Sequence, residues 1–151
     1  MLTESLKRQF TNAFAVLEAA IPSFREDVWR RGKSPFDGPA RATAHALQCG
    51  EFYTCRDRAV LENLGKKKIW EMSDDEMPSQ ESMLRYLSQV RDKTMAWLDG
   101  IGDAGLATPM PDVHAATTLE WVVYALRHFQ HHTGEICAYQ KQAGLPPAPW
   151  K

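Results

Sequence analysis

Apolar residues recur every three or four positions in four separate segments of this 151-residue chain. Such spacing places them on one face of an α-helix, because the helix completes a turn about every 3.6 residues. The alternation of apolar and polar residues typical of strands is missing, and nothing in the sequence repeats. These features predict an all-α fold: a four-helix bundle forming a single domain over residues 1–151.

Residues that begin or stop helices set the expected boundaries. We expect helices from about Thr3 to the approach of Pro22, from Pro39 or Ala40 to about Asn63, from about Ser79 to Asp99, and from Leu119 to Tyr139. Leu64-Gly65 is the expected stop of the second helix. Thr117 followed by Glu120 predicts a capping box at the start of the last helix, and Gly144 before two prolines predicts its end.

The segments between these helices are polar or rich in glycine and proline. Residues 23–31 either continue the first helix after a kink or form a separate turn, and residues 31–39 form a loop expected over one end of the bundle. Residues 66–79 read as a solvated connection that can contain a helical turn. Residues 100–116 read as a long loop carrying His114. The two long connections leave the topology open.

Composition excludes several classes of function. A net charge of −1 gives no indication of nucleic-acid or membrane-surface binding. The N-terminus lacks the apolar run of a signal peptide, and no window approaches the roughly 20 apolar residues of a membrane span. Three cysteines with no CxxC pair do not suggest a disulfide framework. We therefore expect a cytoplasmic protein without nucleic-acid or membrane partners.

Histidines on two of the expected helices form a candidate metal site. His128 and His132 are four residues apart, so their side chains stand roughly 5–6 Å apart on one helix face, and His131 lies about 100° round from His132. Alone, the pair could equally be a polar helix edge. His45 is expected in the middle of the apolar face of the second helix, where a lone histidine is usually a hydrogen-bonded core residue. Together, His45, His128 and His132 predict a histidine triad that binds a metal ion.

The donor set restricts the metal and its chemistry. Three neutral imidazoles suit Zn²⁺, Ni²⁺, Fe²⁺ or Cu²⁺ and suit Ca²⁺ or Mg²⁺ poorly. Three protein ligands leave a position for water or a thiol, as in catalytic zinc sites. Phe129 stands where the HExxH motif of zinc proteases has its general-base glutamate, which disfavours that chemistry.

The sequence resembles the DinB/YfiT-like family of bacterial metalloenzymes over nearly its whole length. The resemblance rests on His45 near the start of the second helix, on His128-x-x-His131-His132-x-Gly134-Glu135, and on the Gly144-Leu145 and Trp150 tail. It implies a four-helix bundle of up-down-down-up topology, often dimeric, with a divalent metal on His45, His128 and His132. Some relatives are thiol transferases and others have hydrolase assignments. Glu135 stands where many members have Gln.

Other residues carry open alternatives. Cys49 lies one turn beyond His45 and can be a fourth ligand or a small core residue. His131 can order its surroundings or simply be exposed, and Glu135 can orient His131 or be an ordinary surface residue. Tyr124 and Tyr139 lie near the histidines and can shape a pocket or belong to the core.

Two further side chains are weighed in the same way. His114 can reach a pocket mouth from its loop. Arg56 can bind an anionic substrate group or extend to water from the helix end. Neither residue is assigned a role from sequence alone.

The expected function is a metal-dependent enzyme of the thiol S-transferase or hydrolase type, with a divalent transition metal (Zn, Ni or Fe) activating a thiol or water. Its partner would be a small-molecule substrate, with a low-molecular-weight thiol as one candidate. Two alternatives are a noncatalytic metal-binding or stress-response bundle and a helical interaction protein whose histidines meet no metal. Apolar surface at Trp97, Trp121 and Trp150, together with the resemblance, predicts a homodimer.

Overall fold

The computed structural model describes residues 1–33, 36–62, 64 and 67–151 and confirms the mainly helical class. The long helices of this described part are α1 (Leu2–Ala20), α3 (Pro39–Cys55), α4 (Gln80–Gly105) and α5 (Thr118–Gln142). The shorter elements are η1 (Ile21–Ser23), α2 (Glu26–Trp29), η2 (Arg58–Glu62), η3 (Ile69–Glu71) and the strands β1 (Pro109–Asp112) and β2 (Ala115–Thr117). None of the described helices is both long and apolar enough to cross a membrane.

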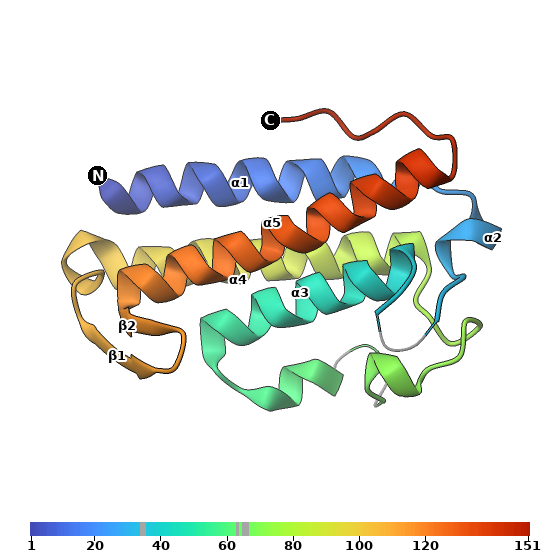
Figure 1. Ribbon diagram of the computed structural model, residues 1–151. Coiled ribbons are helices and arrows are strands. Elements are labelled where there is room, and N and C mark those ends of the chain that lie inside the picture. The colour runs from blue at the N-terminus through green and yellow to red at the C-terminus, as the bar shows by residue number, and fades with distance from the viewer. Residues whose placement is uncertain (34–35, 63, 65–66) are drawn as a thin grey trace.

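The long helices pack around a shared core. Helices α1 and α3 each contact both α4 and α5. In Figure 1, α1 and α5 run in one direction, and α3 and α4 run in the other. Phe14 of α1 and Phe129 of α5 meet in the core with ring centroids 4.6 Å apart. Every long helix contributes fully buried side chains, including Leu17, Leu47, Leu87 and Ile136.

The predicted ends of α5 are confirmed in their chemistry. The Thr117 hydroxyl accepts a hydrogen bond from the Glu120 N–H, while the Glu120 carboxylate accepts from the N–H of Ala116, one residue earlier than in a standard capping box. At the other end, Gly144 adopts φ +72°, and the N–H of Leu145 bonds the carbonyl of Gln140. This is a Schellman motif, and it fixes where α5 stops.

Helix α3 ends earlier than its apolar pattern predicts. It stops at Cys55, because Arg56 takes the left-handed conformation at φ +57°, and η2 follows as a separate element. The expected end at Asn63 is wrong in that respect. Asn63 itself and Gly65 of the expected stop lie outside the described residues.

The apolar face of α3, which carries His45, is only partly buried. His45, Cys49 and Phe52 are half-buried, whereas Gln48 and Glu51 are buried. The reason is that α3 contacts α4, α5 and η3, so it is covered on several sides at once. Polar side chains outside that apolar face, such as Gln48 and Glu51, are therefore buried and need hydrogen-bond partners.

The expected loop over residues 100–116 instead contains the end of a helix and a two-stranded hairpin. Helix α4 continues to Gly105 across a kink at Gly102, whose φ of +58° suits glycine. Strands β1 and β2 then pair antiparallel, with Pro109 opposite Thr117 and Asp112 opposite Ala115. The expectation of a fold without strands is therefore wrong, because four- and three-residue strands are too short for alternation to show in sequence.

The connection before α4 is also less solvated than predicted. Ile69, Met72 and Met77 are buried, and the predicted helical turn is η3. The buried Arg41 guanidinium of α3 donates to the carbonyls of Ile69 and Met72 at 2.7 Å each and pairs with Asp74. Lys66, at the start of this connection, lies outside the described residues, as do Ser34 and Pro35 of the loop over residues 31–39.

Candidate metal centre

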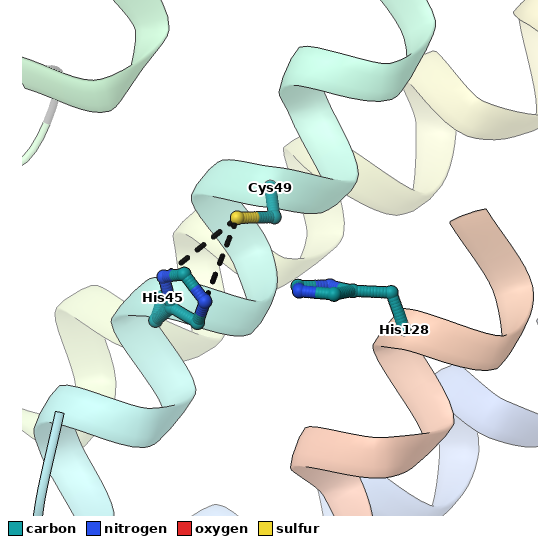
Figure 2. A group of neighbouring side chains, drawn as sticks. All are labelled: His45, Cys49 and His128. Carbon is teal, nitrogen blue, oxygen red and sulfur yellow. Dashed lines mark hydrogen bonds between the residues drawn. The ribbon is translucent and has the colours of Figure 1, made fainter. Parts of the chain in front are cut away.

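The three predicted histidines lie together between α3 and α5. The ring centroid of His45 is 5.4 Å from that of His128 and 4.5 Å from that of His132, and the latter two are 4.5 Å apart. Figure 2 shows His45 and Cys49 on one helix, with His128 pointing towards them from the neighbouring helix. The α3–α5 packing thus brings into contact residues that are more than eighty positions apart in the sequence.

His132 is oriented by a carboxylate. Its Nδ1 lies 2.6 Å from Oε2 of Glu135, and its Nε2 lies 3.2 Å from Nε2 of His128. A carboxylate at that distance accepts the Nδ1 proton, so Nε2 of neutral His132 carries a lone pair. The lone pair faces His128. A carboxylate–histidine pair of this kind is what usually orients a metal-binding imidazole.

His128 leaves one nitrogen unpaired. Its Nδ1 is buried and has no hydrogen-bond partner among the described residues. An unpaired buried polar atom is unfavourable, so this cluster is not satisfied by its own hydrogen bonds. The Nε2 atoms of His128 and His132, which face each other, are the pair that fits a shared cation.

Burial favours the neutral form of His45 and of His128. Loss of solvation, with a smaller contribution from the neighbouring imidazoles, lowers the pKa of His45 from 6.5 to about 4. The same causes lower the pKa of His128 to about 4. Neutral imidazole is the form that coordinates metals, so both side chains are available for coordination at neutral pH.

Cys49 lies closer to the histidines than a simple core residue would require. Its Sγ is 3.7 Å from Nδ1 and 3.8 Å from Nε2 of His45, as the dashed lines in Figure 2 mark. The possible ligand atoms of His45, Cys49 and His128 all lie within 4.8 Å of one another. Burial raises the pKa of the Cys49 thiol to about 12, so the metal-free thiol is protonated.

A second group with the same spacing comprises His131, His132 and Glu135. The predicted triad is thus divided between two groups, which the His128–His132 contact joins. His131 itself is exposed, with Nε2 3.4 Å from Oε1 of Glu135. Glu135 therefore serves both neighbours, and its contact with His132 is the shorter one.

Aromatic side chains surround the histidines. Phe36, from the connection before α3, lies with its ring 4.2 Å from that of His45. Tyr53 and Tyr124 lie 5.5 and 6.3 Å from the His128 ring. Tyr139 lies on α5 seven residues after His132, and its hydroxyl donates to Asp37 at 2.9 Å. Phe36, Tyr53 and Tyr124 thus pack against two of the three histidines.

The remaining two candidates, His114 and Arg56, lie elsewhere, and so does Glu51 of α3. His114 is exposed and lies between β1 and β2. Its ring stacks on that of Tyr124, with the two ring centroids 4.7 Å apart. Arg56 donates to Asp112 at 3.0 Å and lies over the Trp121 ring, so the hairpin engages it. Glu51 points away from the histidines: its carboxylate accepts from the Tyr86 hydroxyl at 2.6 Å and pairs with Lys93.

Sequence reasoning missed two contributors to this site. The partner of His132 is Glu135, three residues later on the same helix face, and the i, i+3 spacing is the signal that could have identified it. Phe36 gives no comparable signal, because it reaches His45 through the path of a connecting segment.

Comparison with models of known protein families gives no match, and comparison with curated proteins gives none either. What can be said of the site therefore rests on its own residues.

Proposed function

We propose that this chain is a divalent-metal-binding protein of the DinB-like kind, with His45, His128 and His132 as ligands. We further propose that it is a metal-dependent enzyme of the thiol S-transferase or hydrolase type, acting on a small molecule. The observation that carries the proposal is the pairing of two contacts on His132: Nδ1 to Glu135 at 2.6 Å, and Nε2 to His128 at 3.2 Å.

The distances suit a transition metal. Nitrogen ligands at about 2.1 Å in a tetrahedral arrangement stand about 3.4 Å apart. The 3.2 Å between the Nε2 atoms of His128 and His132 is close to that separation. Neutral imidazoles, with Cys49 nearby, favour Zn, Ni or Fe over Ca or Mg. These features support the donor set independently of any family resemblance.

The arrangement of the helices supports a DinB-like four-helix bundle of up-down-down-up topology. Helices α1 and α5 run opposite to α3 and α4 (Figure 1). Helices α1 and α3 each contact both α4 and α5, as expected for four helices around one core. In helical bundles, metal sites are built from side chains on facing helices, as His45 on α3 and His128 and His132 on α5 are here.

A bound divalent ion would supply a Lewis acid that lowers the pKa of a water or a thiol substrate. The chain's own residues prepare that chemistry. Glu135 holds the proton on Nδ1 of His132, so that Nε2 is free to coordinate. Phe36 and Tyr53 lie against His45 and His128 and exclude water from those sides of the site.

One observation favours the second candidate, a noncatalytic metal-binding or stress-response protein. Cys49 lies within 3.8 Å of both ring nitrogens of His45. If its thiolate completes the coordination, the site has four protein ligands, which is the number of protein ligands in closed structural zinc sites. Cys49 thus separates the two candidates.

Cobalt substitution tests which candidate holds. Untagged protein is purified anaerobically, loaded with Co²⁺, and examined for the near-ultraviolet band that reports a cobalt–thiolate bond. The thiol S-transferase form of the proposal predicts that the band appears only after a low-molecular-weight thiol is added, and the hydrolase form predicts no band from the protein alone. A band without added thiol, absent from Cys49→Ser, would instead support the closed site. A screen of thiols with model electrophiles then follows on the open form.

We also propose that the chain is a homodimer. Trp150, Val113 and Val123 expose 84%, 93% and 46% of their surface, which leaves apolar groups for a partner to cover. Trp121, which was expected to contribute to that surface, is buried against Tyr53 and does not. Light scattering at high micromolar concentration should give twice the chain mass, and a monomer there would contradict the proposal.

A further inference from the structure

A cavity of about 570 Å³ lies at the end of the molecule where α3 begins and α5 ends. Figure 1 shows α2, the start of α3 and the end of α5 meeting at this end. The cavity lining comes from α2 and the chain just after it, from the start of α3 and from the end of α5, and it includes Arg31, Lys33, Asp37, Asp74 and Tyr139. It does not belong to the histidine cluster, and no role described so far uses it.

The charges around this cavity are unbalanced. The side chains of Arg31 and Lys33 are exposed and have no hydrogen-bond or ion-pair partner among the described residues. The two acidic side chains in the wall are engaged: Asp37 accepts from the Tyr139 hydroxyl at 2.9 Å, and Asp74 pairs with Arg41 at 3.1 Å. Arg25, also in the wall, pairs with Asp27. The tyrosine hydroxyl is neutral, so Asp37 keeps its negative charge; Arg31 and Lys33 exceed it by one positive charge, which attracts an anion.

The backbone adds to the same polarity. The 17-residue helix α3 begins at Pro39 in the cavity wall, and its N-cap, Gly38, offers no side-chain hydrogen bond. Pro39 has no N–H to donate, so the helix start contributes only the partial positive charge of its dipole, which favours anions. A Cβ built on Gly38 would lie 2.2 Å from the carbonyl oxygen of Arg31, so the chain closes tightly here. This tight closure holds Arg31 beside the helix start.

The rest of the wall is apolar. Val28, Pro39, Ala143 and Leu145 line the cavity alongside the charged groups. A site with two free cations, a helix start and apolar walls matches a ligand with both characters. We infer that this cavity binds a small organic anion, a phosphate or carboxylate on an apolar body.

The cavity also bears on the histidine site, a step that rests on the proposed function. Tyr139 follows His132 by seven residues, which is about 10 Å along α5. On the other side, Asp37 follows Phe36, whose ring lies against His45. Tyr139 and Asp37 therefore connect the cavity wall to the two chain segments that carry the histidine site and its Phe36 cover. The substrate class that we infer for the proposed enzyme is a small organic anion.

Calorimetric titration of the full chain with four probes tests the inference. The probes are phenyl phosphate, benzoate, inorganic phosphate and the uncharged benzyl alcohol. We expect phenyl phosphate or benzoate to bind more tightly than inorganic phosphate, and benzyl alcohol to bind least. In Arg31→Gln/Lys33→Gln, binding of the organic anions should weaken by at least about tenfold, because charge-assisted hydrogen bonds are lost.

The matched control is Arg8→Gln/Arg58→Gln, which removes two exposed positive charges outside this cavity and should bind like the wild type. Equal weakening in both double variants would show only a general charge effect and would overturn the inference. So would the absence of binding at millimolar probe concentration. Circular dichroism establishes that each variant is folded.

A second arm separates this inference from the proposed function. His45→Ala/His128→Ala should keep the anion affinity of the wild type while losing metal. Anion binding without metal binding in the wild type would leave the cavity assignment standing and remove the metalloenzyme. Metal binding without anion binding would leave the metal-site proposal standing and overturn the cavity assignment.

Discussion

Glu135 contributes to the candidate site through a single contact, its 2.6 Å hydrogen bond from Nδ1 of His132. Replacing it with alanine leaves His132 free to change tautomer and orientation. We expect Glu135→Ala to weaken Zn²⁺ binding about 10- to 100-fold, the usual effect of removing a partner of this kind. Glu135→Gln, which keeps an acceptor oxygen, should lose less. Competition with a chromogenic chelator measures both affinities.

The control for this variant is His131→Ala. His131 is exposed and also contacts Glu135, but it is not in the proposed ligand set. Its replacement should change the affinity little. If Glu135→Ala binds zinc like the wild type, the proposed orienting role of Glu135 is wrong.

The two depressed histidine pKa values predict an acid sensitivity. The pKa of His45 and of His128 falls from 6.5 in the unfolded chain to about 4 in the folded one, chiefly through burial. Between these values the unfolded chain binds protons that the folded chain does not. The free energy of unfolding of the metal-free protein should therefore decrease as the pH falls from about 6.5 towards 4.

Urea denaturation across that pH range measures the effect. Carboxylates titrate in the same range, so the comparison is with His45→Gln/His128→Gln. The slope of unfolding free energy against pH should be shallower in this variant. Parallel slopes would mean that the two histidines do not carry the acid sensitivity.

For individual residues, the sequence predicts the histidine ligands but not the side chains that orient and cover them. His128 and His132 share a helix face through local geometry alone, so their proximity follows from a four-residue spacing. His45 joins them only because α3 packs on α5, and Phe36 covers His45 only because of a chain path that spacing does not encode.

Among the elements, α5 offers a matched pair of glycines. Gly144 has φ +72° at the helix end, whereas Gly134 lies inside the helix, and a Cβ on either would contact nothing within 4 Å. Gly144→Ala should destabilise by about 1 kcal/mol, because alanine is strained in the left-handed region. Gly134→Ala should stabilise by up to about 1 kcal/mol.

Urea titration of both variants gives the two signs. Since neither position has a packing neighbour to confuse the result, the difference reports backbone conformation alone. The same sign for both substitutions would contradict the assigned end of α5.

Arg41 ties α3 to the connection before α4. Arg41→Ala would leave the carbonyls of Ile69 and Met72 without their donor and Asp74 without its partner. Unsatisfied buried groups cost about 1–3 kcal/mol each, so we expect a loss of at least about 3 kcal/mol. The control is Arg85→Ala, on the exposed face of α4, where the ion pair with Glu81 contributes less than about 1 kcal/mol. Similar losses in the two variants would refute the role of Arg41.

The ends of the elements show why some boundaries were predicted and others were not. The start and end of α5 depend on Thr117, Glu120 and Gly144, which act on their own neighbours. The end of α3 depends on Arg56, which reaches 56 residues along the chain to Asp112. A contact of that range leaves no periodic signal, so the apolar pattern continued past the true end.

For the whole molecule, the core does not depend on the proposed metal. Helices α1 and α4 supply buried residues such as Phe14, Leu17 and Leu87 and no proposed ligand. Chelation should therefore leave the helical circular dichroism spectrum intact at room temperature, unlike in zinc modules that fold only with metal. Added metal should raise the melting temperature by mass action. Loss of helical signal on chelation would contradict this.

The most direct test of the central claim is the metal content of untagged protein. Zn²⁺ bound per chain is measured by elemental analysis after equilibrium dialysis, for the wild type, for His45→Ala/His128→Ala, and for the matched control His114→Ala/His131→Ala. With His45, His128 and His132 as ligands, we predict one ion per chain in the wild type and in the control, and none in the first variant. Equal metal content in all three proteins, or none in the wild type, would contradict the assignment.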